Sequence, residues 1–326
     1  MLSRRSFVQL LAAGSLAAGT LPVMEATARS GAPAPDFAGI DGWLNTPAPL
    51  TMAALRNKVV LVDFWTYSCI NCRRTVPYLN RWQADYGAKG LQVVGIHTPE
   101  FGFEHMRHNV ADAVREFGIR FPVGQDNAFR TWRAWDNRAW PSFYLLDLDG
   151  RIVLIREGEG HAHELEGAIR ALLGVPPSGL APVPGDDPDL SRIRTPEIYF
   201  GATHPTPQDR SQRPRQGEAA YAFPAGVPGP GEYQLDGTWQ RQGEALVLRS
   251  VHGGVRLRFS AAKLHLVAEA AEAAVLRVTV DGVAATAVEV GRPTLYTLLD
   301  GTIYGEHVLT FEADTPGLSI FSATFG

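Results

Sequence analysis

The only two cysteines of the 326-residue chain lie close together, as Cys69-Ile70-Asn71-Cys72. A run of apolar residues typical of a buried strand, Val59 to Trp65, leads into the motif, and a helical pattern follows from Asn71 to Tyr86. A cysteine at the start of a helix lies near the positive end of the helix dipole and near unpaired backbone N–H groups. Both favour the thiolate. We therefore expect a redox pair, with Cys69 as the attacking thiolate and Cys72 as the resolving thiol.

Three other uses of the pair are compatible with its spacing. A structural disulfide closing so small a loop would restrain the unfolded chain by only about 2 kcal/mol, and a chain of this length has enough core without it. A zinc site would need further Cys or His ligands, and the sequence contains no second CxxC motif. The third use is two buried thiols with no chemical role. We favour the redox pair and expect no metal and no cofactor.

Residues 1–28 have the pattern of an export signal. Arg4-Arg5 precedes an apolar run from Val8 to Met24, and Ala26-Thr27-Ala28 supplies the small residues that a signal peptidase requires. The adjacent arginines match a twin-arginine signal. The alternative is an uncleaved membrane anchor, but glycines and a proline interrupt a run that is already short for a membrane span. We expect a cleaved signal and a protein located in the periplasm or otherwise outside the cytoplasm.

The charge of the chain is nearly balanced, with 30 basic and 34 acidic residues and a net charge of −4. So mild a negative balance gives no reason to expect nucleic acid or an anionic membrane surface as a partner.

Strand and helix patterns alternate through a first domain, for which we predict the range 35–175. The predicted strands are 59–65, 91–96, 142–147 and 152–156, and the predicted helices are 71–86, 104–117, 127–135 and 164–173. Asp149-Gly150 is a turn signal between the last two strands. This order predicts an α/β domain with a mixed sheet and helices on both faces.

A second domain, predicted for residues 191–326, has almost no helical periodicity. It follows a linker, 176–190, that is rich in proline and glycine. Its β-type runs are 245–248, 255–259, 263–267, 276–280, 294–299, 307–311 and 319–325, with turn signals at Asp236-Gly237, Asp281-Gly282 and Asp300-Gly301. Short strands with this spacing predict an antiparallel sandwich. Residues 263–274 are also compatible with a short helix.

The segment from Val60 to Trp65, followed by Cys69, Cys72 and Pro77, resembles the thioredoxin superfamily and its TlpA-like members. Longer segments are similar to the extracytoplasmic thioredoxin-like and C-terminal parts of DipZ proteins. These segments are 64–79, 95–101, Trp140-Pro141, 194–199, 235–239 and Phe325-Gly326. The resemblance covers residues 35–326. It implies a thioredoxin-like fold followed by a sandwich like those of galactose-binding domains and carbohydrate-binding modules.

The resemblance also implies roles for two further residues. Asp63 occupies the position of the buried thioredoxin aspartate, whose burial would raise its pKa and make it a base for the Cys72 proton. Pro141 would be the cis-proline that lies opposite the cysteine pair. The alternatives are an exposed acid at a strand end for Asp63 and an ordinary trans proline for Pro141.

Together these features predict an exported thiol–disulfide oxidoreductase that exchanges its dithiol with extracytoplasmic protein thiols and disulfides, in the direction of a reductase. DipZ proteins usually carry a CcdA-like membrane domain that brings electrons across the membrane, and an export signal stands in its place here. The resemblance makes a CcdA-type membrane protein one candidate electron donor and leaves the donor open. One alternative is a carbohydrate-binding or docking protein with a vestigial thioredoxin domain, in which Tyr233, Trp239, Tyr296 and Tyr304 are candidates to stack on a glycan. The other is a thiol peroxidase, although Val62 stands where peroxiredoxins have a proline.

Overall fold

The structure is a computed structural model that describes residues 31–176, 188–204, 206, 208–213, 215 and 217–326. The predicted export signal, residues 1–28, lies outside the described residues, as does most of the predicted linker. No helix in the described ranges is long and apolar enough to cross a membrane. The boundaries proposed for the two domains stay predictions.

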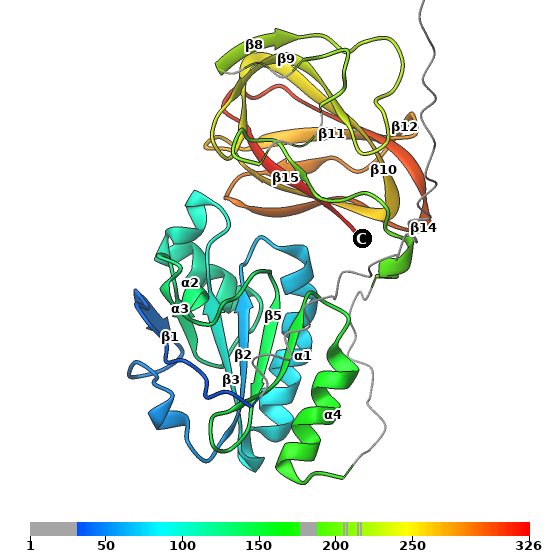
Figure 1. Cartoon of the computed structure of the whole chain (residues 1–326). Helices are drawn as coiled ribbons and strands as arrows, with labels where there is room; N and C mark the ends of the chain where they lie inside the picture. Colours follow the sequence, from blue (N-terminus) through cyan, green and yellow to red (C-terminus); the bar gives the residue numbers. More distant parts are fainter. Residues whose placement is uncertain (1–30, 177–187, 205, 207, 214, 216) are drawn as a thin grey trace, which may run out of the picture.

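Six strands of the first domain form a mixed sheet in the order β1-β4-β3-β2-β5-β6 (Figure 1). These strands are β1 (Gly42–Leu44), β2 (Val59–Trp65), β3 (Leu91–His97), β4 (Val123–Gln125), β5 (Ser142–Leu146) and β6 (Ile152–Glu157). The β2–β3 and β3–β4 pairs are parallel, whereas the other pairs are antiparallel. Every residue of β2 is buried, as its apolar run predicts for a central strand.

Helices cover both faces of this sheet. Apolar side chains of α1 (Ile70–Tyr86), α2 (Arg107–Glu116) and α4 (Ala162–Leu173) pack in one cluster on one face. On the other face lie α3 (Arg130–Ala134) and aromatic residues of the N-terminal arm. The predicted α/β architecture is confirmed. The helix predicted over 104–117 is instead a 3-10 turn, Gly102–His105, followed by α2.

The second domain is an all-antiparallel sheet that bends around one hydrophobic core (Figure 1). Its strands are β7 (Ile198–Tyr199), β8 (Gly217–Tyr221), β9 (Tyr233–Arg241), β10 (Leu246–Glu269), β11 (Ala274–Val280), β12 (Val283–Ala284), β13 (Val288–Val290), β14 (Thr294–Ala313) and β15 (Ser319–Phe325). The two longest strands, β10 and β14, pair along most of their length, and β10 also pairs with β9 and β15. The prediction of an all-β antiparallel domain is confirmed.

Two predicted strand breaks in this domain are wrong. Asp236-Gly237 lies within β9 and Asp300-Gly301 lies within β14. At Gly237, φ is +89°, and a Cβ would lie 2.5 Å from the His252 carbonyl oxygen, so this glycine permits an irregularity in a continuous strand. The helix considered for 263–274 is also wrong, since its first half belongs to β10 and pairs with strands on both sides.

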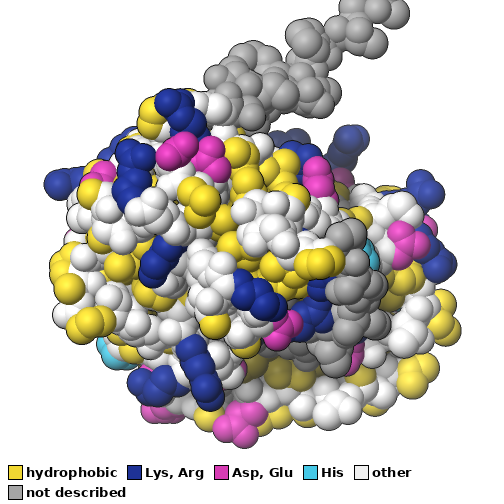
Figure 2. Space-filling model, turned by 90° about the horizontal axis from the view of Figure 1, so that it is seen from below, with side chains coloured by type: hydrophobic (Ala, Val, Ile, Leu, Met, Phe, Trp, Pro, Cys, Tyr) yellow, Lys and Arg dark blue, Asp and Glu magenta, His cyan; other side chains and the backbone are white. Residues whose placement is uncertain are grey.

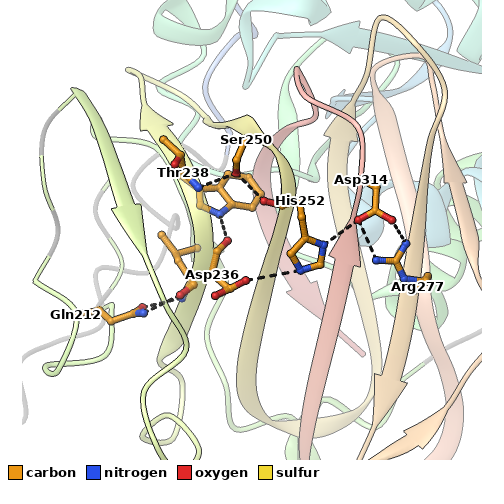
Figure 3. A network of polar contacts seen from close by, with 9 residues as sticks. Gln212, Asp236, Thr238, Ser250, His252, Arg277 and Asp314 are labelled. Atoms are coloured by element: carbon orange, nitrogen blue, oxygen red, sulfur yellow. Dashed lines mark hydrogen bonds and ion pairs between the residues drawn. The ribbon is translucent and has the colours of Figure 1, made fainter.

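A polar network ties the strands of the second domain together (Figure 3). His252 on β10 lies between Asp314, whose Oδ1 is 2.8 Å from His252 Nδ1, and Asp236 on β9. Arg277 on β11 also pairs with Asp314. Hydrogen bonds from Arg277 and His252 lower the pKa of Asp314 to about 2. The network links β9, β10, β11 and the residue after β14.

The two domains contact each other at the N-terminal end of α1 (Figure 1). Ile70 and Phe101 of the first domain share an apolar cluster with Leu295 and Phe321 of the second. The Phe321 ring centroid lies 5.3 Å from that of Phe101 and 4.9 Å from that of Phe103. The opposite end of the first domain, seen in Figure 2, carries basic and acidic side chains dispersed among apolar ones. The end of the sheet at which the cysteines lie is therefore the end that faces the second domain.

We predict that Phe321→Ala uncouples the two domains. Truncating a buried phenylalanine costs about 3 kcal/mol or more, and Phe321 is 6% exposed between two rings of the other domain. Differential scanning calorimetry should then resolve two thermal transitions that lie closer together in the unmodified protein. The control Val251→Ala, at a side chain that is 71% exposed, should leave the thermogram unchanged. An unchanged thermogram for Phe321→Ala would show that this cluster does not couple the domains.

Candidate active site

The cysteine pair opens helix α1 directly after the buried strand β2. Cys69 is the N-cap residue, and its sulfur accepts a hydrogen bond from the Cys72 backbone N–H at 3.4 Å. Both thiols are free; Cys69 is half-buried, whereas Cys72 is completely buried. A reactant that approaches from solvent can therefore reach the Cys69 sulfur before that of Cys72.

Asp63 lies on β2 beneath the pair and is 1% exposed. Burial raises its pKa well above the ordinary value, and its Oδ1 atom has no hydrogen-bond partner among the described residues. The pKa of Cys72 is also raised, first by burial, then by its interactions with Cys69 and by the charge of Asp63. Both groups thus hold their protons to higher pH than in water. Once one proton has been lost, the other can pass between the two groups, with a single negative charge on whichever group lacks it.

Pro141 immediately precedes β5, and the Trp140–Pro141 peptide bond is cis. Because Ser142 pairs with Phe64, Pro141 is placed beside the end of β2, where the chain enters the cysteine loop. The Pro141 side chain is buried, and its carbonyl oxygen accepts a hydrogen bond from Gly158 N–H at 2.8 Å. The fold therefore places Cys69, Cys72, Asp63 and Pro141 at one end of the central sheet.

Glu104 supports this end of the sheet, and sequence reasoning did not identify it. Its carboxylate is fully buried and accepts hydrogen bonds from Ser68 N–H at 3.2 Å and Ser68 Oγ at 2.7 Å. It also accepts hydrogen bonds from the backbone N–H groups of Glu100 and Phe101. The residue before Cys69 is thus tied to the loop after β3. Ser68 lies 36 positions earlier in the chain, so no local motif marks this contact.

His97 lies at the end of β3 behind the same loop. Its ring stacks on Tyr67 at a centroid distance of 5.7 Å and meets the Trp65 ring edge-on at 5.2 Å. Burial lowers the pKa of His97 to about 3. The imidazole therefore stays neutral at physiological pH and adds no charge to the surroundings of the cysteines. No group of three or more His, Cys, Asp or Glu residues that could hold a metal ion occurs in the part of the chain that the structure describes.

Two arginines of α1 connect the cysteine helix to the second domain. Arg73 donates to the Tyr67 carbonyl oxygen at 2.7 Å and to Thr294 Oγ1 at 2.5 Å, and burial lowers its pKa to about 10. Arg74 forms a buried ion pair with Glu159 of its own domain at 3.2 Å, and its Nη2 atom lies 3.5 Å from His265 Nε2 of the second domain. The CxxC motif does not predict these contacts, because Thr294 belongs to the other domain and is distant in the chain.

Comparisons with known proteins agree with this geometry. Residues 29–172 match the Redoxin family, and residues 195–326 match a family described as thioredoxin-like C-terminal domain. The chain is thus similar to a Redoxin domain over its first part and to a thioredoxin-like C-terminal domain over its second. It is 35% identical over 300 residues to the protein DipZ of Mycobacterium bovis and to that of Mycobacterium tuberculosis. The match covers 90% of this chain but only 43% of each DipZ protein.

Matches to other proteins cover the Redoxin domain. The thiol-disulfide oxidoreductase ResA of Bacillus thuringiensis is 27% identical over 118 residues, which are 36% of this chain and 65% of ResA. A solved structure described as a putative thiol:disulfide interchange protein DsbE from Chlorobium tepidum is 29% identical, with a TM-score of 0.40, and covers 44% of this chain and 98% of its own. The expected resemblance to thioredoxin-like and DipZ proteins is confirmed.

The buried Asp63 predicts a specific dependence of stability on pH. In the unfolded chain this carboxyl ionises above about pH 4, whereas its raised pKa keeps it protonated to higher pH in the folded protein. The folded state therefore binds more protons, and stability falls as pH rises through this window. Asp63→Asn removes this loss, so its free energy of unfolding should gain on that of the unmodified protein as pH rises above about 4.

Urea unfolding at several pH values, with both proteins held in the dithiol form, measures this difference. The control Asp149→Asn changes an exposed carboxyl and should follow the unmodified protein at every pH. Parallel curves for the unmodified protein and Asp63→Asn would contradict the raised pKa of Asp63.

Proposed function

We propose that the protein is an exported thiol–disulfide oxidoreductase that reduces disulfides of extracytoplasmic proteins. The observation that carries the proposal is a half-buried Cys69 at the start of α1 with a buried Cys72 and a buried Asp63 behind it. The Redoxin match and the similarity to DipZ and ResA support this chemistry. The pattern of residues 1–28 supports export by the twin-arginine route.

In the proposed reaction, the Cys69 thiolate attacks one sulfur of the substrate disulfide. An S–S bond forms between Cys69 and the substrate, and the other substrate sulfur leaves as a thiolate. Cys72 then passes its proton to the Asp63 carboxylate and attacks the Cys69 sulfur. The Cys69–Cys72 disulfide forms, the second substrate sulfur is released, and two electrons have moved from the protein to the substrate.

Pro141 would contact the substrate segment that lies beside Cys69. A proline has no N–H, so its position beside the cysteine loop leaves that stretch of backbone without a donor. Its role, like that of Asp63 in proton transfer, is part of the proposal. Both rest on their positions at the end of β2.

Two partners belong to the proposal, an electron donor and a ligand of the second domain. The chain spans less than half the length of the DipZ proteins it matches, and a CcdA-type membrane protein is the electron donor we propose. A glycan ligand of the second domain stays a prediction. Of the four aromatic candidates for it, Tyr233 and Trp239 belong to the core and are not available to stack on a sugar.

We predict that the mature protein, supplied with a small dithiol, reduces the disulfides of insulin and that Cys69→Ser abolishes this activity. Cys72→Ser retains the attacking thiol but lacks the resolving one, so it should accumulate a mixed disulfide with the substrate. Turbidity measures insulin reduction, and non-reducing mass spectrometry detects the mixed disulfide. Full activity of the Cys69→Ser variant would refute the mechanism.

We further predict a reduction potential for the Cys69–Cys72 pair near that of thioredoxin, about −270 mV, rather than near the −120 mV typical of an oxidant. Buried acidic groups without a counter-charge disfavour the thiolate form of the cysteine pair. A pair is strongly oxidising when its reduced, thiolate form is stabilised, so we expect this pair to be reducing. Equilibration with glutathione and dithiothreitol buffers, followed by alkylation and mass spectrometry, gives the value. A potential close to −120 mV would assign the protein to the oxidases.

A further inference from the structure

A cleft of about 310 Å³ lies between the two domains beside the proposed redox centre. The first domain contributes the loop from Pro99 to Phe101 together with Phe129 and Trp140, and the second contributes Tyr199, His204 and Glu244. Trp140 immediately precedes Pro141, and Phe101 shares its apolar cluster with Ile70, the residue after Cys69. Two residues of the cleft lining are thus adjacent to residues of the proposed redox centre, one in the chain and one through the shared apolar cluster.

Carboxyl groups in and behind the walls of the cleft have no basic partner among the described residues. Glu100 Oε1 and Glu197 Oε2 lie 2.7 Å and 2.9 Å from the Tyr199 hydroxyl oxygen. Glu244 also lines the cleft, where its carboxylate accepts a hydrogen bond from Gly102 N–H at 2.8 Å. No ion pair to these three glutamates occurs among the described residues, whereas Glu159 and Glu166 pair with arginines.

At the Tyr199 hydroxyl, two carboxyl groups meet without a basic side chain to pair with them. A phenol has one proton and can donate to only one of the two carboxyl groups, so the second contact requires a proton on a glutamate. Burial raises the pKa of both Glu100 and Glu197, and the neighbouring acids raise that of Glu100 further. A cation in the cleft would replace that proton as the counter-charge.

Aromatic rings supply the remaining wall. The rings of Trp140 and Phe129 lie with their centroids 6.5 Å apart, and the Tyr199 ring is 5.4 Å from that of His204. Aromatic faces bind guanidinium and ammonium groups, with arginine the more frequent partner. A cleft with carboxyl groups and aromatic rings, open to solvent and free of Lys and Arg in its lining, thus matches a basic side chain.

We propose that this interdomain cleft is a subsite for an arginine or lysine side chain of the substrate polypeptide, close to the disulfide that Cys69 attacks. The proposal rests on the proposed function and extends it. It makes the second domain part of the substrate site, because Tyr199 and Glu244 come from that domain. It also means that the redox centre would prefer disulfides with a basic side chain nearby over other disulfides.

A set of matched disulfide peptides tests the subsite with the full mature protein in its dithiol form. Each peptide has one cysteine joined to an invariant neutral thiol, and arginine or glutamine is placed in turn at every position flanking that cysteine. At one or two adjacent positions the arginine peptide should react roughly tenfold faster than its glutamine partner, as expected for a charge pair at a recognition surface. Arginine at the other positions should have a much smaller effect.

Variants of the cleft separate local recognition from the general attraction of a basic peptide to an acidic protein. Glu100→Gln should reduce the ratio of arginine to glutamine rates to near one at the preferred position. The matched control Glu218→Gln removes an exposed carboxyl on β8, outside the lining of the cleft, and should keep the ratio. Equal rates for arginine and glutamine at every position, with glutamine peptides still reduced, would overturn the subsite and leave the proposed function standing. A ratio that survives in Glu100→Gln would overturn it as well, and failure to reduce any peptide would overturn both.

Discussion

The packing of the second domain against the start of α1 is the contact on which the surroundings of the cysteine pair depend. Ile70, between the cysteines, is buried in an apolar cluster that continues into Phe321 of the second domain. Arg73 crosses the same boundary, from the Tyr67 carbonyl oxygen to Thr294. A thioredoxin-like domain alone would expose these groups to water. Here they are desolvated, so the second domain contributes to the electrostatic environment of the redox centre.

The buried acidic residues near the cysteine pair differ in the number of hydrogen bonds that their carboxyl oxygens accept. Glu104 accepts four hydrogen bonds, from Ser68 and from the backbone of Glu100 and Phe101, so both of its buried carboxyl oxygens have partners. Asp63 has an oxygen with no partner, and its pKa is raised. The difference assigns different tasks: Glu104 holds the loop before Cys69 in place, whereas Asp63 is free to accept and release a proton. His97, neutral and packed between aromatic rings, excludes water from the same region.

The first domain can be predicted well from the sequence, because patterns of neighbouring residues mark its strands and helices. The uninterrupted apolar run of β2 indicates a central strand, and the cysteines that follow it mark the start of α1. In the second domain the turn signals at Asp236-Gly237 and Asp300-Gly301 misled, because an Asp-Gly pair fits a bulge inside a long strand as well as a hairpin. The contacts of Arg73, Glu104 and Tyr199 could not be predicted, since each joins residues distant in the chain and none has a repeating pattern.

The position of the second domain also limits how a substrate reaches Cys69. One side of the helix start is closed by the cluster of Ile70, Leu295 and Phe321. The cleft lined by Trp140, Glu100 and Tyr199 lies next to this closed side. A polypeptide bound there contacts both domains at once, so binding energy from its side chains can orient its disulfide toward the Cys69 sulfur. The same contacts would be lost if the domains separated, so in the proposed subsite substrate selection would depend on the packing of the two domains.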